Sequence, residues 1–178
     1  RIWMIAGITV RILLLLALLL PVASLGDSTT PYRNLPKLDL RVFRCYPSPG
    51  HHVIASQGDL AQALGKFSGH CREPEFGAMK SAFLSSLAAA GLRWDREALV
   101  VVAEWYGTGM ARAHLELAQS RPGVVDAAIV WKLPPPPHTP DTAVFRGAFA
   151  VRKDAVTAVS VTGDWPGGIH STTTPMVK

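Results

Sequence analysis

Apolar residues recur along this chain at two different spacings, and the spacing changes near Trp94. Before Trp94 most apolar side chains are three or four positions apart, which is the period of a helix with one buried face. After Trp94 they alternate with polar residues, which is the period of a half-buried strand. The pattern therefore predicts an α+β domain in which the helices precede most of the strands.

The first half of the domain is predicted to contain one strand and two helices. Apolar residues alternate at 38–42, which indicates a strand. Ser56 is a suitable N-cap for a short helix that runs to about Phe67. A longer helix is expected from Pro74 to Gly91, because proline suits a first helical turn and glycine a helix end. The apolar stripe of this helix is Phe76, Met79, Phe83, Leu84 and Leu87.

The second half is predicted to be a series of strands. Residues 98–106 form a β-branched run that is typical of a central strand buried on both faces. Further strands are expected at 111–117, 125–131, 145–151 and 156–161. Gly123 suits a type II turn before the second of these. The expected fold is α+β, with a single antiparallel β-sheet of about five to six strands and two helices inserted after the first strand.

The N-terminal segment has the pattern of an export signal. The apolar run 12–20 follows Arg11 and is too short for the roughly 20 residues of a membrane-spanning helix. Small residues follow it, so cleavage is expected after Ser24 or Gly26. The alternative is an uncleaved anchor formed by residues 2–23, which would place Arg11 inside the membrane.

The remaining boundaries follow from composition. We expect a signal peptide at 1–26, a flexible leader at 27–37 and one domain at 38–161. Residues 162–178 are rich in Gly, Pro, Ser and Thr, and they are expected to form a loose tail.

The charge pattern argues against a nucleic-acid binder. Without residues 1–26 the chain keeps 16 basic and 13 acidic side chains, a net charge of +3. The basic residues are scattered, whereas nucleic-acid-binding proteins usually gather them on one face.

The two cysteines, Cys45 and Cys71, predict a disulfide, because an even count in an exported chain usually reflects oxidative pairing. Such a bond would close a loop of about 27 residues and contribute about 3–4 kcal/mol. The alternative is a pair of buried free thiols.

No familiar catalytic motif is present in the sequence. His51, His52 and His70 lie on the loop that the disulfide would close, and three imidazoles would suit zinc or copper. The alternative is that they are solvated loop residues. His114 and Glu116 share one face of a strand, as metal ligands or an acid–base pair would, but that face also fits ordinary polar exposure.

Two loops and a set of aromatic residues are candidates for binding. The aromatic residues are Trp94, Trp105, Tyr106, Trp131 and Trp165, which would suit a ligand face or the core. The first candidate interaction loop is Gly107, Thr108 and Gly109. The second is the proline run Pro134, Pro135, Pro136 and Pro137, which would dock a partner as a polyproline segment or act as a stiff connection.

The layout resembles the C-terminal domain of the PrcB family, named for an accessory subunit of a secreted bacterial protease complex. The resemblance covers about residues 38–161 and rests on five segments. These are Val53-Ile54-Ala55-Ser56-Gln57, Trp94-Asp95, the apolar strand 99–102, the Gly-Thr-Gly turn 107–109 and Phe149-Ala150-Val151-Arg152-Lys153. The resemblance implies an accessory or stabilising role and no catalytic residues.

We therefore expect an exported, non-enzymatic interaction domain that stabilises a partner protein such as a secreted protease. No cofactor, metal or nucleic acid is expected, and membrane contact is expected only through the signal peptide. The expected location is the periplasm, the cell surface or the extracellular medium. Two alternatives remain open: a cell-envelope module that binds a small ligand or glycan, and a metal-dependent enzyme or metal carrier.

Overall fold

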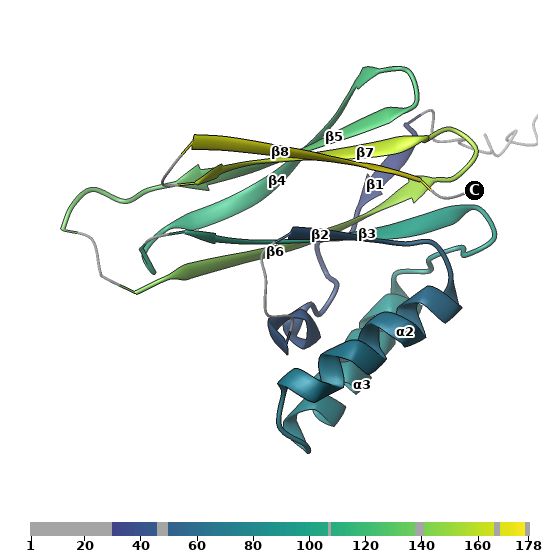
Figure 1. Cartoon of the computed structure of the whole chain (residues 1–178), viewed down its shortest axis with the longest axis horizontal. Coiled ribbons are helices and arrows are strands. Elements are labelled where there is room, and N and C mark those ends of the chain that lie inside the picture. The colour runs from purple at the N-terminus through teal and green to yellow at the C-terminus, as the bar shows by residue number, and fades with distance from the viewer. Residues whose placement is uncertain (1–29, 46–49, 107, 138–140, 166–167, 177–178) are drawn as a thin grey trace, which may run out of the picture.

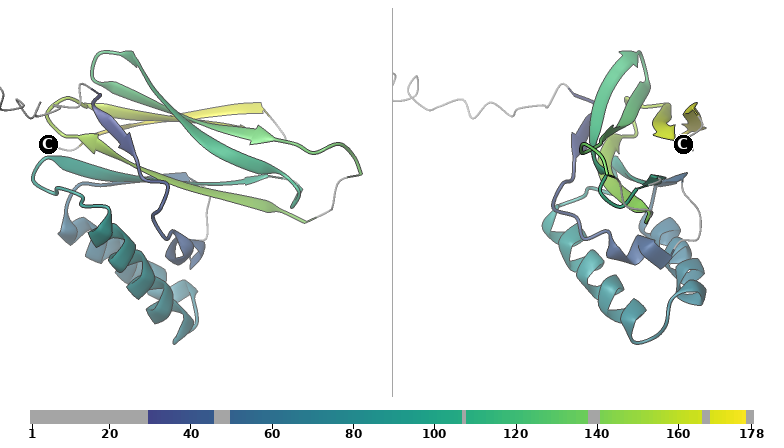
Figure 2. Two further views of the ribbon diagram at one scale, coloured as in Figure 1. Left: turned by 180° about the vertical axis from the view of Figure 1, so that it is seen from behind. Right: turned by 90° about the vertical axis from the view of Figure 1, so that its left-hand side faces the viewer.

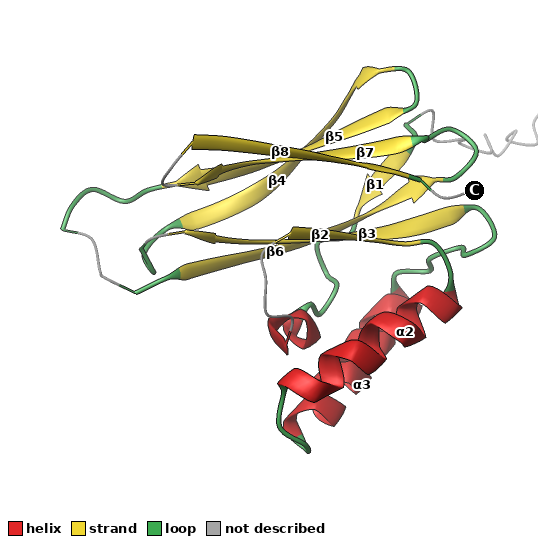
Figure 3. Cartoon of the chain, viewed as in Figure 1, coloured by secondary structure: helices red, strands yellow, loops and turns green. Residues whose placement is uncertain are grey.

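Two four-stranded sheets stack face to face, and two helices cover the outer face of one of them (Figures 1 and 3). The computed structural model describes residues 30–45, 50–106, 108–137, 141–165 and 168–176. The mixed α+β class agrees with the sequence pattern. The expected single sheet is wrong, because the strands divide between two sheets.

The sheet next to the helices, which we call sheet A, has the order β1-β6-β3-β2, and all its neighbouring strands are antiparallel. Its strands are β1 (Tyr32–Asn34), β2 (Gly50–Ile54), β3 (Glu97–Tyr106) and β6 (Ala143–Arg152). The long strands β3 and β6 therefore form its centre, with short strands at both edges.

The second sheet, sheet B, has the order β4-β5-β7-β8. Its strands are β4 (Arg112–Arg121), β5 (Val124–Lys132), β7 (Ala158–Trp165) and β8 (Gly168–Pro175). The pair β5–β7 is parallel, so the expectation of purely antiparallel strands is also wrong. This parallel pair arises because the chain leaves sheet B after β5, forms β6 in sheet A, and then returns for β7.

The helices α2 (Gln57–Phe67) and α3 (Glu75–Ala89) lie between β2 and β3, and so follow the second strand rather than the first. The expected caps are confirmed. The Ser56 hydroxyl accepts the backbone N–H of Asp59 at 3.1 Å, and Gly91 takes a positive φ of 60° just after α3. Gly123 also has a positive φ, at the turn between β4 and β5.

The alternating residues of β3 belong to two separate cores. Leu99 and Val101 pack with the helices, whereas Val100 and Val102 pack between the sheets. Burial of β3 on both faces is thus confirmed, and the side view in Figure 2 shows the resulting order of sheet B, sheet A and helices. The largest fully buried side chains include Phe83 on the helix side and Phe149 between the sheets.

Cys45 and Cys71 form the expected disulfide, which joins the short 3-10 helix η1 (Arg41–Cys45) to the segment after η2 (Ser68–His70). A disulfide of this kind indicates an oxidising compartment of the type that exported proteins enter. Within the described part of the chain, no helix is long and apolar enough to span a membrane.

Three segments differ from the sequence-based expectation. The strand expected at 38–42 is a loop that leads into η1, because Leu38 and Val42 pack against the helices instead of pairing in a sheet. The expected leader 27–37 contains β1, and the expected loose tail 162–178 contains the end of β7 and all of β8. The predicted signal peptide, residues 1–26, lies outside the described residues.

Candidate functional site

The two predicted interaction loops lie at the same end of the sandwich, on the left in Figure 1. The backbone N–H of Gly109 donates to Oδ1 of Asp141 at 3.3 Å, which connects the β3–β4 turn to the β5–β6 loop. A Cβ atom at Gly109 would collide with the Asp141 carboxylate in its present position, so glycine allows this close approach. Thr108 is buried beneath the turn, and Gly107 lies outside the described residues.

The proline run forms the outer part of this end. Pro134 is half-buried, whereas Pro135, Pro136 and Pro137 are exposed. The run is therefore accessible to a partner, although it also serves as the connection between the two sheets.

Four exposed apolar side chains belong to the strands and turns of the same end. Trp105 and Val144 are direct cross-strand neighbours on the outer face of sheet A, where the helices do not reach (Figure 1). Met110 lies in the β3–β4 turn, and Leu133 follows β5. We call these four exposed residues the loop-end patch. Apolar patches on exposed ends often mark protein-interaction surfaces.

A layer of aromatic rings lies between the sheets near the same end. Tyr106 and Trp131 have ring centroids 4.9 Å apart, and Trp131 meets Phe145 edge-to-face at 6.4 Å. These contacts place both Tyr106 and Trp131 inside the sandwich, and Trp94 packs near the helix-side core. The aromatic residues therefore do not form one flat ligand-binding face. The side chain of Trp165 lies outside the described residues.

The charges around the patch are mainly basic. Arg112 and Lys132 are cross-strand partners at the end of sheet B, and Arg146 lies two residues from Val144 on the same face of β6. Burial lowers the pKa of Arg146, and the neighbouring Arg44 lowers it further. A half-buried guanidinium beside another cation favours an acidic partner group.

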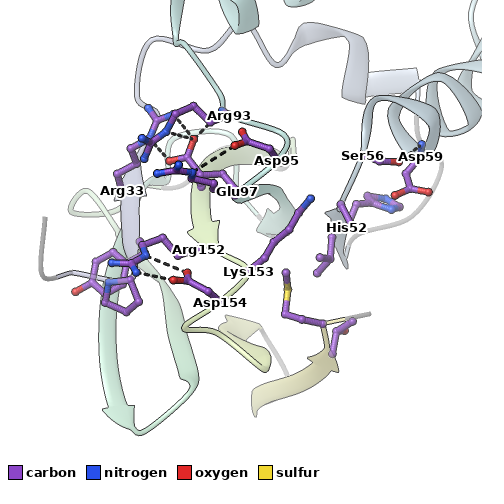
Figure 4. A pocket seen from close by; sticks show the side chains of 18 of the residues that line it. Arg33, His52, Ser56, Asp59, Arg93, Asp95, Glu97, Arg152, Lys153 and Asp154 are labelled. Atoms are coloured by element: carbon purple, nitrogen blue, oxygen red, sulfur yellow. Dashed lines mark hydrogen bonds and ion pairs between the residues drawn. The ribbon is translucent and has the colours of Figure 1, made fainter. Parts of the chain in front are cut away.

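The opposite end of the sandwich contains a larger cavity of about 1680 Å³, shown in Figure 4. Its charged side chains are largely paired with one another. Arg33 holds Glu97 through two bonds of 2.8 and 3.0 Å, and Arg152 donates to Asp154. The hydrogen bonds from Arg33 lower the pKa of Glu97 despite its burial.

These ion pairs have a clear structural role. Arg33 also donates to the carbonyl oxygens of Ala90 and Gly91, so one guanidinium joins β1, the end of α3 and β3. The ammonium of Lys153 donates to the carbonyl of Trp94. The charges of this cavity thus hold the elements together, and they give it less capacity to recognise a ligand.

The three histidines considered as metal ligands are separated. His51 points toward sheet B, where its Nε2 lies 2.6 Å from the hydroxyl of Thr174. His52 is adjacent on the strand and packs on the opposite face against Phe67. His70 lies beyond α2 in η2 and is exposed. In the described residues, no three His, Cys, Asp or Glu side chains are arranged to hold a metal.

His114 and Glu116 do contact one another, at 2.9 Å, on the exposed face of the edge strand β4. Both side chains are well exposed, and Leu115 between them faces the core. The pair fits the polar face of a half-buried strand.

The sequence reasoning missed Glu104, a carboxylate buried between the sheets beside a small cavity. A signal was available, because Glu104 continues the inward-facing series of Val100 and Val102 on β3. A carboxyl group at an inward-facing position of a buried strand is costly unless it has polar partners, so its presence there indicates a polar site between the sheets.

Comparison of the chain with protein-family models, curated proteins and solved structures gives no match. The functional inference therefore depends on the geometry of the molecule itself.

Proposed function

We propose that this protein is an exported, non-enzymatic interaction domain that binds and stabilises a partner protein through the loop-end patch. The observation that carries the proposal is the joining of two loops, through Gly109 and Asp141, beside four exposed apolar side chains. A few well-packed residues, often including a tryptophan such as Trp105, contribute most of the binding energy in many protein interfaces.

The basic residues around the patch indicate the chemistry of the partner surface. Arg112, Lys132 and Arg146 would pair with carboxylates at the rim, while Trp105 and Leu133 would enter apolar depressions. The resemblance to the PrcB family makes a secreted protease the first partner to test.

A pull-down with matched variants tests this proposal. Leu133 is 44% exposed and Leu84 on α3 is 40% exposed, so Leu84→Ser is a matched control for Leu133→Ser. We expect the wild-type protein and the Leu84→Ser variant to recover one protein at near-equimolar amount from the envelope and medium of producing cells. The Leu133→Ser variant should reduce that recovery, and adding Trp105→Ala should bring the loss to about tenfold or more, since truncating an interface anchor often costs about 2 kcal/mol or more.

Equal recovery by the patch variant and the control would contradict the proposal. Activity of the recovered protein, measured with and without this domain, distinguishes stabilisation from simple binding. If the partner is a protease, its half-life at constant temperature should increase when the domain is bound.

The glycan-binding alternative has less support, because Tyr106, Trp131 and Phe145 are stacked inside the sandwich and do not join the exposed Trp105 in one face.

A further inference from the structure

Arg146 is a half-buried arginine on the outer face of sheet A, and within the described chain no acidic side chain pairs with it. Its Nε atom is buried and has no hydrogen-bond partner. The described residues include two other half-buried arginines, Arg33 and Arg152. Both are paired with carboxylates, those of Glu97 and Asp154. Arg146 is therefore the exception, and the described chain leaves its charge without a counter-ion.

The charge of Arg146 is permanent, because a guanidinium is not deprotonated in proteins at ordinary pH. Burial lowers the pKa of Arg146, and the positive charge of Arg44 lowers it further. Both effects oppose the charged form, so the fold keeps this guanidinium in place at a cost in free energy. A bound anion would offset both effects, because it supplies the opposite charge and accepts N–H groups.

Arg44 supplies a second guanidinium for the same anion. It lies on η1, which is on the same side of sheet A as the helices (Figure 1). Its side chain is 59% exposed, and its contact with Glu75 is a single ion pair of 3.5 Å between two exposed side chains. Such a surface pair is weak and leaves most of the five N–H groups of Arg44 available. Two neighbouring guanidinium groups suit an oxyanion, since each can donate two parallel hydrogen bonds.

The residues beside Arg146 leave room for a ligand. Ala103 on β3 is its direct cross-strand neighbour, and Gly50 on β2 is the next residue in the same row. Among the described residues, no atom outside the adjacent positions lies within 4 Å of a Cβ atom placed at Gly50. In the other direction, Val144 and Trp105 of the loop-end patch form the next pair on this face. A ligand with an anionic group beside an apolar group would therefore contact both Arg146 and the patch.

We propose that Arg146, together with Arg44, binds an oxyanion on the outer face of sheet A. Carboxylates and phosphates share the required chemistry, because both accept paired hydrogen bonds from the terminal nitrogens of a guanidinium. The site deepens the proposed function if the anion is an acidic side chain of the partner, and that use of the site rests on the proposed function. Binding of the anion itself does not.

Titration of the isotope-labelled protein at low ionic strength tests the inference. The reporters are the Nε–H signal of Arg146 and the backbone amide signals of Ala103 and Gly147. The free anions are acetate and inorganic phosphate, and the side-chain probe is a capped pentapeptide with one central glutamate among glycines. Acetamide and the same peptide with glutamine are the uncharged controls.

We expect saturable shifts of these signals with the anionic probes alone. Arg146→Gln should weaken binding by about tenfold or more, because charge-assisted hydrogen bonds are lost. Arg44→Gln should weaken it by a smaller factor, since Arg44 is more exposed. Arg121→Gln is the matched control, because it removes the same charge from an exposed position at the end of β4 and should change the affinity little.

Absence of saturable shifts for every anionic probe in the wild-type protein would overturn the inference, and this measurement needs no variant to fold. Equal shifts with the uncharged controls, or equal losses of affinity in Arg146→Gln and Arg121→Gln, would overturn it too. Tighter binding of the glutamate peptide than of the free anions assigns a partner side chain, and the reverse order assigns a small free anion. The titration uses this protein alone, so it can succeed where the pull-down fails, and the two proposals can fail separately.

Discussion

At the scale of single residues, the charge of Glu97 determines how firmly β1 and α3 are attached to sheet A. Its carboxylate accepts two bonds from Arg33 and the backbone N–H of Arg93, and these bonds lower its pKa from the ordinary value of 4.5. A lowered pKa in the folded state means that the stabilisation is present above pH 4.5. It is lost as the pH falls through the folded-state pKa.

We therefore predict that Glu97→Gln lowers the free energy of unfolding by about 1.5–3 kcal/mol at pH 7, the range for hydrogen bonds to charged groups. The difference from wild type should shrink as the pH falls toward 3. Urea denaturation at several pH values measures it. The control is Asp95→Asn, since Asp95 is paired with Arg96 on the surface and should contribute little. A loss of stability that is the same at every pH would contradict the prediction.

Residue-level features with a local cause could be predicted from the sequence. The Ser56 cap and the positive φ of Gly91 and Gly123 follow from near neighbours in the chain. The Arg33–Glu97 pair could not be predicted, because its partners are 64 positions apart and nothing local joins them. The inward position of Glu104 could have been predicted. Its strand was recognised, and the alternation of inward-facing residues along that strand extends to Glu104.

At the scale of elements, the disulfide fixes η1 against the helices. The bond encloses β2 and α2, so its removal frees a segment of about 27 residues in the unfolded chain. We predict that reduction lowers the free energy of unfolding by about 3–4 kcal/mol. Denaturation curves with and without reductant measure the change. The double variant Cys45→Ala/Cys71→Ala serves as the control, because its stability should not respond to reductant.

The elements that were predicted wrongly share a physical cause. The alternation of apolar residues at 38–42 indicated a strand. Leu38 and Val42 are instead buried against the helices, from a loop and from the 3-10 helix η1. The tail lacked an apolar face, yet residues 168–175 pair with β7 at the edge of sheet B. Hydroxyl groups of Ser160 and Ser171 meet on the outer face of these strands, so the pair needs little apolar surface there.

At the scale of the whole molecule, the division into two sheets depends on long-range pairing. Each strand pattern was recognised, but the parallel pairing of β5 with β7 requires β6 to cross to the other sheet. The residues of the turns between consecutive strands do not predict which sheet the next strand will join. Two hydrogen bonds between the sheets also join residues far apart in the sequence. The Tyr32 hydroxyl donates to the carbonyl of Leu117, and the His51 imidazole bonds to the Thr174 hydroxyl.

The C-terminal strand therefore belongs to the core of the molecule, and its removal tests the whole architecture. β8 pairs with β7 along its full length, and Met176 just after it is buried between the sheets. A chain that ends at Trp165 would lose these contacts, and burial of the Met176 side chain alone is worth about 1.5–3 kcal/mol. We predict that this truncated chain loses cooperative thermal unfolding, measured by calorimetry. A chain that ends at Met176 is the matched control and should unfold like the full-length protein. Cooperative unfolding of the shorter chain at an unchanged temperature would contradict this prediction, because it would show that β8 does not stabilise the core. The pairing of β8 with β7 and the burial of Met176 are the reasons to expect the opposite result.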